Sequence, residues 1–318
     1  MPTPSQPPVR IGTRASKLAL IQAGWVQRRI AAALGAAEAD ADQVAPLVHI
    51  TTTGDRVQDR RLLEIGGKAL FTKEIEAALL DGRIDCAVHS LKDMPAELPP
   101  GLIIGAVPER EDVRDVFISH KARTLAELSP GAALGTASLR RQAQALHLRP
   151  DLQLVNLRGN VDTRLAKLEA GEADAIILAL AGLNRMGLTD LPATPLDPYE
   201  TPPAPGQGAL AIEVRVEDAA APWLAALIHA PSVLAVAAER GALAALEGSC
   251  KTAIGAYARL DGDLLRLTVE ALTPDGARRF RREGEADVGG AGGEAVARAL
   301  GVSLGQAVFA EGGAALEL

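Results

Sequence analysis

The stretch that decides the fold is residues 84–95, Ile-Asp-Cys-Ala-Val-His-Ser-Leu-Lys-Asp-Met-Pro. Its first part is a short apolar run with β-branched residues, which predicts a buried strand. The chain then turns polar at once, and Pro95 with Pro99-Pro100-Gly101 prevents a helix from following. Lys92 and Asp93 are therefore expected just beyond the carboxyl end of a strand, where open α/β sheets bind their ligands. A solvated Lys–Asp pair in a surface turn would fit the same residues.

Length and composition narrow the class of protein. The chain has 318 residues, enough for about two or three domains, and its 48% hydrophobic and 23% charged residues are typical of a globular protein. Aromatic residues make up only 3%, so platforms for stacking bases are scarce, and the net charge of -7 does not favour binding to a phosphate backbone. We therefore expect no nucleic-acid partner.

The sequence indicates the cellular compartment through its N-terminal segment and its cysteines. The histidines bear on metal binding. Residues 1–8 lack the basic-then-apolar pattern of a secretory signal, and no apolar run approaches the ~20 residues that cross a bilayer. The two cysteines form no motif, which indicates a reducing compartment, and the five histidines form no cluster with metal-ligand spacing. We expect a soluble, cytoplasmic protein with no metal and no membrane partner.

A strand followed by a helix is predicted at the start of the chain. Val9–Gly12 reads as a strand, and Ser16 can cap a helix that runs to about Leu34. Arg14 and Ser16 then lie between a strand end and a helix start, where backbone N–H groups favour anions. A plain helix cap and a surface arginine are the alternative.

A long polar segment, residues 53–71, follows the predicted strand at Leu47–Ile50. Such a segment inside a compact α/β domain is often a mobile lid, although a disordered surface loop has the same pattern. Gly67-Lys68 is not part of a phosphate-binding Walker loop, because the upstream glycine is absent and Ala69 replaces the serine or threonine. A helix from Thr72 to Asp81 is expected to lead into the opening strand.

The alternation of strands and helices continues to the middle of the chain. A Pro-rich linker is predicted at Tyr199–Gly208, and Ala209–Val214 then forms a strand that can cross back to the first half. Two α/β halves that are joined by crossovers and face a shared cleft are typical of hinged binding proteins. The other predicted strands are Leu102–Val107, Asp115–Ser119, Ala133–Gly135, Leu152–Leu157 and Ala175–Leu178.

Arginines recur beyond the ends of these strands. Ser138 is a candidate N-cap that places Arg140 and Arg141 in the first turn of a helix, where cations are unfavourable, and such a local violation hints at function. The planar guanidinium fork suits bidentate binding of carboxylate or phosphate, so a polyanion pocket is expected rather than a set of solvated helix faces. The arginines are Arg140, Arg141, Arg158, Arg164 and Arg185.

From Trp223 the pattern changes to two helices, then short strands with turns at Asp261-Gly262 and Asp275-Gly276, and a final helix. This predicts a small α+β domain with a three-stranded antiparallel sheet. The expected fold is therefore two α/β domains of the periplasmic-binding-protein type around a cleft, followed by this small domain. We expect domain 1 at residues 9–108 plus 203–221, domain 2 at 109–202 and domain 3 at 222–318.

One of the two cysteines has the surroundings of a nucleophile. Cys250 lies in a Gly/Ser loop beside Lys251, and a nearby cation lowers the pKa of a thiol. An inert small residue is the other interpretation, and it is the one that we assign to Cys86, inside a predicted strand.

Several blocks of the sequence carry a family resemblance. They are Ile11-Gly12-Thr13-Arg14 with Leu18-Ala19-Leu20, Thr52-Thr53-Gly54-Asp55, Gly66-Gly67-Lys68, residues 89–95, Ser138-Leu139-Arg140-Arg141, residues 156–160, Ala181-Gly182-Leu183 and residues 205–209. In this order and over nearly the whole length, the chain resembles the porphobilinogen deaminase (hydroxymethylbilane synthase) family.

The resemblance implies a transferase of porphyrin and heme biosynthesis that is a monomer. Such an enzyme joins four porphobilinogens head to tail and releases ammonia each time, which gives the linear tetrapyrrole hydroxymethylbilane. It also implies a dipyrromethane cofactor, built from substrate and held by a thioether bond to Cys250. Loss of ammonia leaves a cationic azafulvene, which the carboxylate aligned with the family's catalytic acid, Asp93, would stabilise. The same carboxylate can move the proton that the ring loses.

The resemblance also assigns the remaining side chains of the site, which hold carboxylates or cover the cleft. The side chains implied to hold the cofactor are Lys92, Ser138, Arg140 and Arg141. Those implied to bind the substrate are Arg14, Ser16, Arg158, Arg164 and Arg185. Lys68 and Phe71 are implied to belong to the lid over residues 53–71.

The sequence departs from the family pattern at a few positions. Ser249 replaces the usual glycine before the cofactor cysteine, and Lys251-Thr252-Ala253 replaces Gln-Val-Pro after it. Ala69 replaces a glycine, and Lys17 stands where proline is common. These changes affect loop geometry and remove no charged catalytic group.

The main alternative is a two-lobed module that binds a small anion without catalysis. That interpretation predicts a signal peptide or a fused regulatory domain, and it gives no role to Cys250 or to a Lys–Asp pair at the cleft. An enzyme acting on phosphate esters is a weaker alternative, because the chain has neither a phosphate loop nor metal ligands.

Overall fold

The computed structural model of the protein describes residues 7–56, 71–246 and 253–316. These residues form two compact units. The first unit comprises residues 7–56, 71–110 and 209–233, and the second comprises residues 111–208, 234–246 and 253–316. None of the helices within these ranges is long and apolar enough to cross a membrane.

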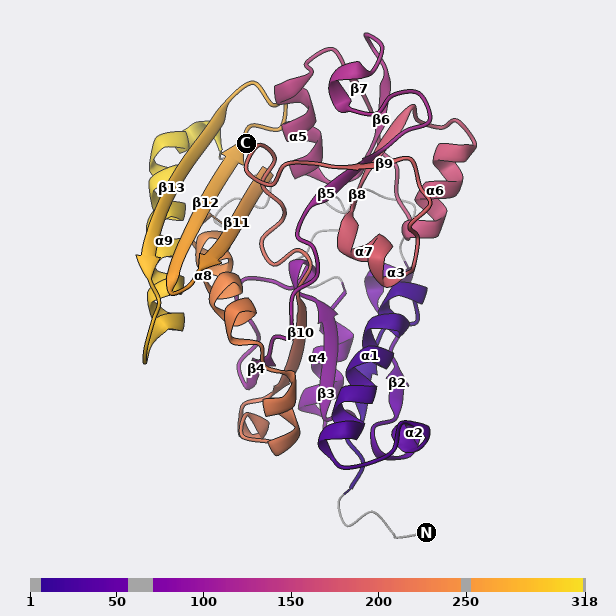
Figure 1. Ribbon diagram of the computed structural model, residues 1–318, viewed down its shortest axis with the longest axis vertical. Helices are drawn as coiled ribbons and strands as arrows, with labels where there is room; N and C mark the ends of the chain where they lie inside the picture. Colours follow the sequence, from indigo (N-terminus) through magenta and orange to yellow (C-terminus); the bar gives the residue numbers. More distant parts are fainter. Residues whose placement is uncertain (1–6, 57–70, 247–252, 317–318) are drawn as a thin grey trace. The chain divides into compact units, whose positions relative to one another are not determined.

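The first unit is built on a five-stranded sheet with the order β2-β1-β3-β10-β4 (Figure 1). β1 runs parallel to β2 and β3, whereas β10 runs antiparallel to β3 and β4. β10 follows the linker in sequence, so the predicted return of the chain to the first half is confirmed. The strands are β1 Ile11–Thr13, β2 Leu47–His49, β3 Cys86–Ser90, β4 Leu102–Ala106 and β10 Leu210–Arg215.

Helices pack on both faces of this sheet because successive side chains of β3 point to opposite sides. α1 (Lys17–Ala33) shares a core with Val88, whereas α4 (Lys73–Leu80) shares a different core with Ala87. β3 is thus buried on both faces, as its near-continuous apolar run predicted. The shorter helices are α2 Ala41–Val44, α3 Thr53–Arg56 and the 3-10 helices Glu38–Asp40, Leu91–Asp93, Val216–Asp218 and Pro222–Leu227.

The second unit contains another five-stranded sheet, with the order β7-β6-β8-β5-β9. β6 is parallel to β7 and β8, and β5 is antiparallel to β8 and β9, which repeats the pattern of the first sheet. The elements are β5 Asp115–Ile118, β6 Ala133–Gly135, β7 Gln153–Val155, β8 Ala175–Ala179, β9 Ala193–Pro195, α5 Leu139–Leu148, α6 Val161–Glu169, α7 Leu180–Arg185 and the 3-10 helix Leu125–Glu127.

β9 was not predicted from the sequence. It is three residues long, ends on Pro195 and pairs with β5 alone in the sheet order. Proline donates no hydrogen bond to a neighbouring strand and is therefore found at sheet edges, where a strand leaves little apolar pattern.

A three-stranded antiparallel sheet, β11-β12-β13, completes the second unit. Val269 and Leu267 of β12 belong to a core that the flanking helices share, and Gly262 closes the first hairpin turn with a φ of 61°. The elements are α8 Ala230–Leu246, β11 Ala253–Asp261, β12 Leu264–Leu272, β13 Arg279–Asp287, α9 Gly293–Gly312 and the 3-10 helix Gly313–Ala315.

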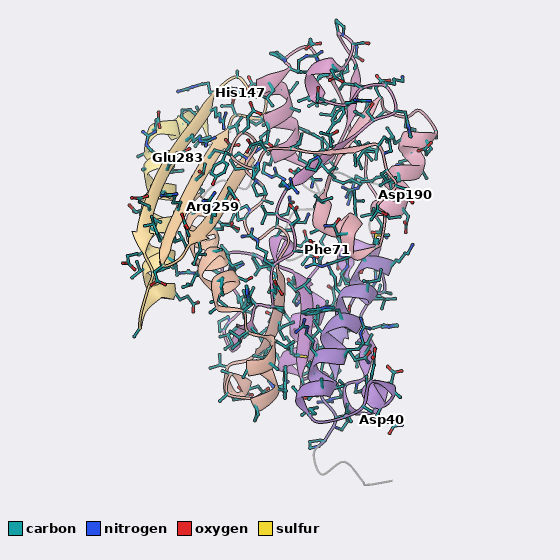
Figure 2. The ribbon with its side chains drawn as sticks, in the orientation of Figure 1. Asp40, Phe71, His147, Asp190, Arg259 and Glu283 are labelled. Atoms are coloured by element: carbon teal, nitrogen blue, oxygen red, sulfur yellow. The ribbon has the colours of Figure 1, made fainter. Side chains whose placement is uncertain are left out.

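The two sheets of the second unit are joined through α5. Ala143 of α5 shares a small core with Ala253 of β11 and Leu272 of β12. His147, labelled in Figure 2, donates a hydrogen bond from Nδ1 to the carbonyl oxygen of Gly276 at 2.9 Å. The predicted fold class is thus confirmed in its parts, two α/β sheets and a small antiparallel α+β part, while the cleft between the halves stays a prediction.

Candidate active site

The Lys92–Asp93 pair lies where the sequence predicted it. β3 ends at Ser90 and runs directly into the 3-10 helix Leu91–Asp93. The side chain of Leu91 is buried, and its N–H donates to the carbonyl oxygen of Ala209 at 3.0 Å. Lys92 is half-buried and Asp93 is exposed. The turn therefore has a fixed base and presents a carboxylate outward.

Arg14 is held by a carboxylate and an aromatic ring. Its Nε lies 3.0 Å from Oδ1 of Asp55, and its Nη2 contacts the same oxygen. The ring centroid of Phe71 lies 4.2 Å from Arg14 Cζ, a cation–π distance. Burial opposes ionisation of Asp55, but hydrogen bonds from Arg14 and Thr52 outweigh it, so the pKa of Asp55 lies below its ordinary value. Arg14 is thus more than a surface arginine.

Gly54 gives Phe71 the space for this contact. A Cβ atom at Gly54 would lie 2.2 Å from a carbon of the Phe71 ring, which is far inside van der Waals contact. Any other residue at this position would displace the ring from beneath Arg14.

Ser16 caps α1. Its Oγ accepts a hydrogen bond from the N–H of Ala19 at 3.4 Å, which confirms the predicted helix start. A role in binding substrate stays a prediction.

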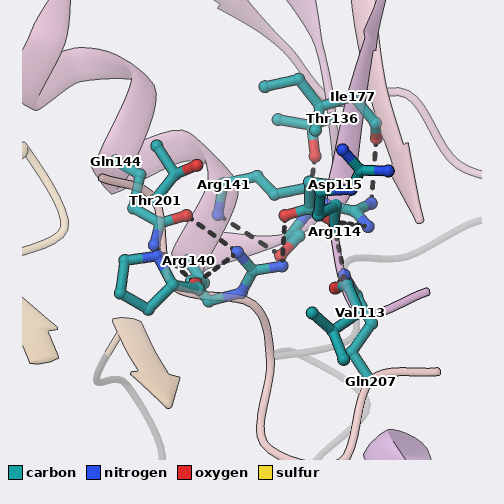
Figure 3. Close-up of polar contacts among 12 residues, drawn as sticks. Val113, Arg114, Asp115, Thr136, Arg140, Arg141, Gln144, Ile177, Thr201 and Gln207 are labelled. Carbon is teal, nitrogen blue, oxygen red and sulfur yellow. Dashed lines mark hydrogen bonds and ion pairs between the residues drawn. The ribbon is translucent and has the colours of Figure 1, made fainter. Parts of the chain in front are cut away.

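A buried ion cluster surrounds Asp115 at the start of β5 (Figure 3). Nη2 of Arg140 lies 2.8 Å from one carboxylate oxygen of Asp115, and Nη2 of Arg141 lies 2.8 Å from the other. Gln207 donates from Nε2 to the same carboxylate at 2.9 Å. Full burial works against ionisation of Asp115, but the charges of Arg140 and Arg141 outweigh it and hold its pKa well below the ordinary value.

The two arginines differ in their other partners. Arg141 donates from Nη1 to the carbonyl oxygen of Ile177 at 2.9 Å, whereas Arg140 donates from Nη1 to Gln144 and to the carbonyl oxygen of Pro202. Nε of Arg140 is buried and has no hydrogen-bond partner among the described residues. Asp115 is shared by both guanidinium groups, and the charge of the buried Glu270 also acts on Arg140.

The cluster extends into the three-stranded sheet. Gln144 donates to Oε1 of Glu270 at 2.7 Å, and Nε of Arg279 donates to Oε2 of the same carboxylate at 2.8 Å. Glu270 is completely buried. The N-terminal half of α5 therefore makes polar contacts to β5, to β12 and to the linker.

Asp115, Gln207 and Glu270 were not predicted as site residues from the sequence. Asp115 was predicted only as the first residue of a strand. An acidic residue at a strand position that must be buried is itself a signal, because charged side chains are almost never fully buried without a partner.

The other arginines of the second unit have separate surroundings. Arg158 is half-buried, and its Nη1 is buried without a hydrogen-bond partner among the described residues. Arg164 donates from Nε to the carbonyl oxygen of Gly159 at 2.7 Å, and Arg185 donates from Nη2 to that of Gly208 at 2.7 Å. Burial lowers the pKa of Arg185.

Some predicted site residues lie outside the described residues. These are Cys250, Lys68 and the central part of the predicted lid. Cys86 is fully buried in β3, and burial raises the pKa of its thiol, as expected for an inert small residue. No group of three or more His, Cys, Asp and Glu side chains suited to a metal ion occurs in the part of the chain that the structure describes.

Comparison with known proteins identifies the family. The family model for "Porphobilinogen deaminase, dipyromethane cofactor binding domain" matches residues 9–222, and the model for "Porphobilinogen deaminase, C-terminal domain" matches residues 233–310. The chain belongs to the porphobilinogen deaminase family. The predicted resemblance is thereby confirmed.

Relatives in this family match over almost the entire chain. The porphobilinogen deaminase of Caulobacter sp. (strain K31) is 68% identical over 315 residues, which cover 99% of this chain and 99% of the relative. That of Caulobacter vibrioides (strain NA1000 / CB15N) is 67% identical and covers 98% of this chain and 98% of the relative. That of Phenylobacterium zucineum (strain HLK1) is 66% identical and covers 99% of this chain and 100% of the relative.

Solved structures with similar backbones are distant in sequence. A periplasmic substrate-binding protein of an ABC transporter from Coxiella burnetii has a TM-score of 0.43 and 18% identity, and covers 73% of this chain and 96% of that protein. The methionine-binding protein MetQ has a TM-score of 0.43 and 14% identity, and covers 71% of this chain and 89% of that protein.

The residues of the second unit fit the cofactor of this family. Buried guanidinium nitrogens of Arg140 and Arg158 lack hydrogen-bond partners among the described residues. A dipyrromethane with carboxylate side chains is the kind of group that such donors bind.

Proposed function

We propose that this porphobilinogen deaminase family member condenses four porphobilinogens head to tail, releases ammonia at each step and yields hydroxymethylbilane. Membership of the family over residues 9–222 and 233–310 carries this proposal. The alternative, a two-lobed anion-binding module without catalysis, is not favoured by that membership. The function belongs to porphyrin and heme biosynthesis and makes the protein a transferase.

Asp93 is the proposed catalytic acid and base. Its carboxylate is exposed at the end of a turn whose base is buried, so it can approach a substrate nitrogen without a large movement of the backbone. There it stabilises the positive charge that forms when ammonia leaves the aminomethylpyrrole. It then accepts the proton that the attacked ring loses as aromaticity returns. Lys92, its neighbour, is proposed to help hold the cofactor.

Cys250 is the proposed attachment point of the dipyrromethane, which supplies the terminal pyrrole that accepts the first substrate. Cys250 precedes Ala253 by three residues, and three residues of extended chain span about 11 Å. Ala253 packs against Ala143 of α5, the helix whose first turn carries Arg140 and Arg141. This short distance along the chain supports the proposal that Ser138, Arg140 and Arg141 hold the cofactor carboxylates.

Five further residues are proposed to bind the carboxylates of the substrate. Arg158 supports this best, because its buried Nη1 lacks a hydrogen-bond partner among the described residues. We propose that Phe71 and Lys68 belong to a lid over residues 53–71, and the contact of Phe71 with Arg14 supports a link between lid and substrate site. The proposed substrate-binding residues are Arg14, Ser16, Arg158, Arg164 and Arg185.

The proposal also covers organisation and location. The domains are proposed at residues 9–108 plus 203–221, 109–202 and 222–318. Porphobilinogen is the small-molecule partner, the protein is a cytoplasmic monomer, and no nucleic acid is bound. The net charge of -7 supports the last point.

Intact-mass spectrometry of the purified protein tests the function together with an activity assay. We expect the mass to exceed that of the chain by one dipyrromethane, and the Cys250→Ser variant to have the mass of the bare chain. Active wild-type protein with a bare-chain mass would contradict the cofactor assignment. Absence of porphobilinogen consumption by protein that carries the adduct would contradict the function.

A further inference from the structure

Three titratable side chains lie buried in the first unit, and the proposed chemistry uses none of them. Glu76 of α4, His89 of β3 and Glu213 of β10 are only 5%, 6% and 0% exposed. Nε2 of His89 lies 2.9 Å from Oε2 of Glu213, and the charges of both residues act on Glu76. These residues form the Glu76–His89–Glu213 cluster.

The cluster is only partly hydrogen-bonded. One carboxylate oxygen of Glu213 and one of Glu76 are buried and have no partner among the described residues. Buried ionic groups are often no more stabilising than apolar residues of the same size, so the stability of the fold does not explain the cluster. Departures of this kind from simple packing concentrate at functional sites.

The position of the cluster suggests what it does. His89 is the last residue but one of β3, and the strand continues without a break into the turn that carries Lys92 and Asp93. Ser90, the next residue, points to the opposite face and accepts a hydrogen bond from Nε2 of Gln22 at 3.1 Å. The final two residues of the strand are therefore anchored on both faces of the sheet.

The contact also fixes the register of two strands. In the antiparallel pair of β3 and β10, His89 lies opposite Ala211 and Glu213 lies opposite Ala87. The His89–Glu213 contact is thus a diagonal bridge between the strands. A slip of one residue would break it and would move the following turn by about 3.4 Å along the strand.

We propose that His89 and Glu213 are positioning residues for catalysis, which hold the end of β3 and thereby the carboxylate of Asp93. Glu76 of α4 lies near enough to the pair for the charges of both residues to act on it. This inference rests on the proposed role of Asp93. It assigns no contact with substrate to the cluster, because all three side chains are buried.

Variants at His89 test the inference. His89→Leu removes the bond to Glu213, and His89→Gln keeps an N–H donor at a similar distance. A displacement of about 1 Å at a reacting group can cost on the order of 100-fold in rate. For His89→Leu we expect kcat for porphobilinogen consumption to fall by on the order of 10- to 100-fold, with KM and the adduct mass unchanged, and for His89→Gln we expect most of kcat to return. Ile75→Val, a change in the core on the same side of the sheet, is the matched control and should leave kcat unchanged.

Two results would overturn the inference. One is a folded His89→Leu protein whose kcat stays within about twofold of the wild type. The other is a loss of kcat that Ile75→Val reproduces at the same loss of thermal stability. If His89→Leu does not fold, Glu213→Met is measured instead, because methionine keeps the length of the side chain but offers His89 no oxygen acceptor. The same criteria for kcat and KM then apply. A wild-type protein that carries the adduct and consumes no porphobilinogen removes the proposed function itself.

Discussion

Nη2 of Arg140 lies 2.8 Å from Oδ2 of Asp115, and both side chains are almost completely buried. The other oxygen of the same carboxylate binds Arg141 at 2.8 Å. One buried acid therefore orients both arginines that are proposed to hold the cofactor. The placement of cations in the first turn of α5, unfavourable for the helix by itself, is offset by this carboxylate.

Asp115→Asn should be strongly destabilising. The variant leaves two buried guanidinium groups without their shared counterion, and such a loss typically costs about 3–5 kcal/mol of unfolding free energy. Urea denaturation measures it. Asp151→Asn, which breaks the exposed ion pair with Arg149, is the control and should hardly move the midpoint. Equal midpoints for the two variants would contradict this assignment.

Stability should fall in acid through the carboxylates of Asp55, of Asp115 and of Asp85, which pairs with Arg10 at 2.8 Å. The pKa of each lies below the ordinary value of 3.8 in the folded state, so the folded protein binds fewer protons than the unfolded chain. Their contribution is complete above pH values near 3.8 and is lost as the pH falls through the folded-state pKa values. Through these groups, unfolding midpoints should change little from pH 7 to about pH 5 and should decrease from there to about pH 2. A flat profile over the lower range would argue against these ion pairs.

Glu76 should have the opposite pH dependence. Burial and the charge of Glu213 raise its pKa above the ordinary value of 4.5, so the folded state holds this proton more tightly than the unfolded chain does. The stabilisation is complete below pH 4.5 and is lost as the pH rises towards the folded-state pKa. Glu76→Gln, which cannot ionise, should therefore gain stability relative to the wild type as the pH rises from 4 to 8. A difference in unfolding free energy between Glu76→Gln and the wild type that stays constant over this pH range would contradict the prediction.

Asp93→Asn should nearly abolish turnover and leave the fold intact. The side chain is exposed, so its charge contributes little to stability, whereas loss of one group that stabilises developing charge typically costs about 100- to 1000-fold in kcat. Steady-state kinetics and intact mass are the measurements. Substantial remaining activity in protein that carries the adduct would remove Asp93 from its central role.

Gly54→Ala should raise KM for porphobilinogen by displacing Phe71 from Arg14. The added Cβ would lie 2.2 Å from the ring, and overpacking of this kind costs about 1–3 kcal/mol. Gly24→Ala in α1 is the matched control, because its Cβ meets nothing closer than 3.6 Å, and we expect a gain of about 0.5–1 kcal/mol from helix propensity there. Unchanged KM in Gly54→Ala would show that the contact has no part in substrate binding.

The sequence predicted the elements with strong local patterns. The apolar run before Ser90 and the polar turn after it placed Lys92 and Asp93 correctly, because strand and turn preferences act over a few neighbouring residues. The Ser138 cap was equally local: its Oγ accepts a bond from the N–H of Arg141. β9 was missed because an edge strand of three residues has no such pattern.

Long-range partners could not be predicted in the same way. Arg140 and Arg141 were singled out, but the acid that binds Arg141 lies 26 positions away in the chain, and Gln144 meets Glu270 across 126 positions. His89 and Glu213 are 124 positions apart. Pairings across such distances depend on the assembled sheets, which a single sequence does not display.

The methyl groups of Ala143 and Ala253 meet in one small core with Leu272, so the helix that bears the arginine pair rests on the C-terminal sheet. Because the arginine pair is proposed to hold the cofactor, we expect an inherited change on that sheet to weaken cofactor retention although it touches no ligand. An exchange of C-terminal regions between relatives would preserve this packing only where the incoming residue is as small as Ala253.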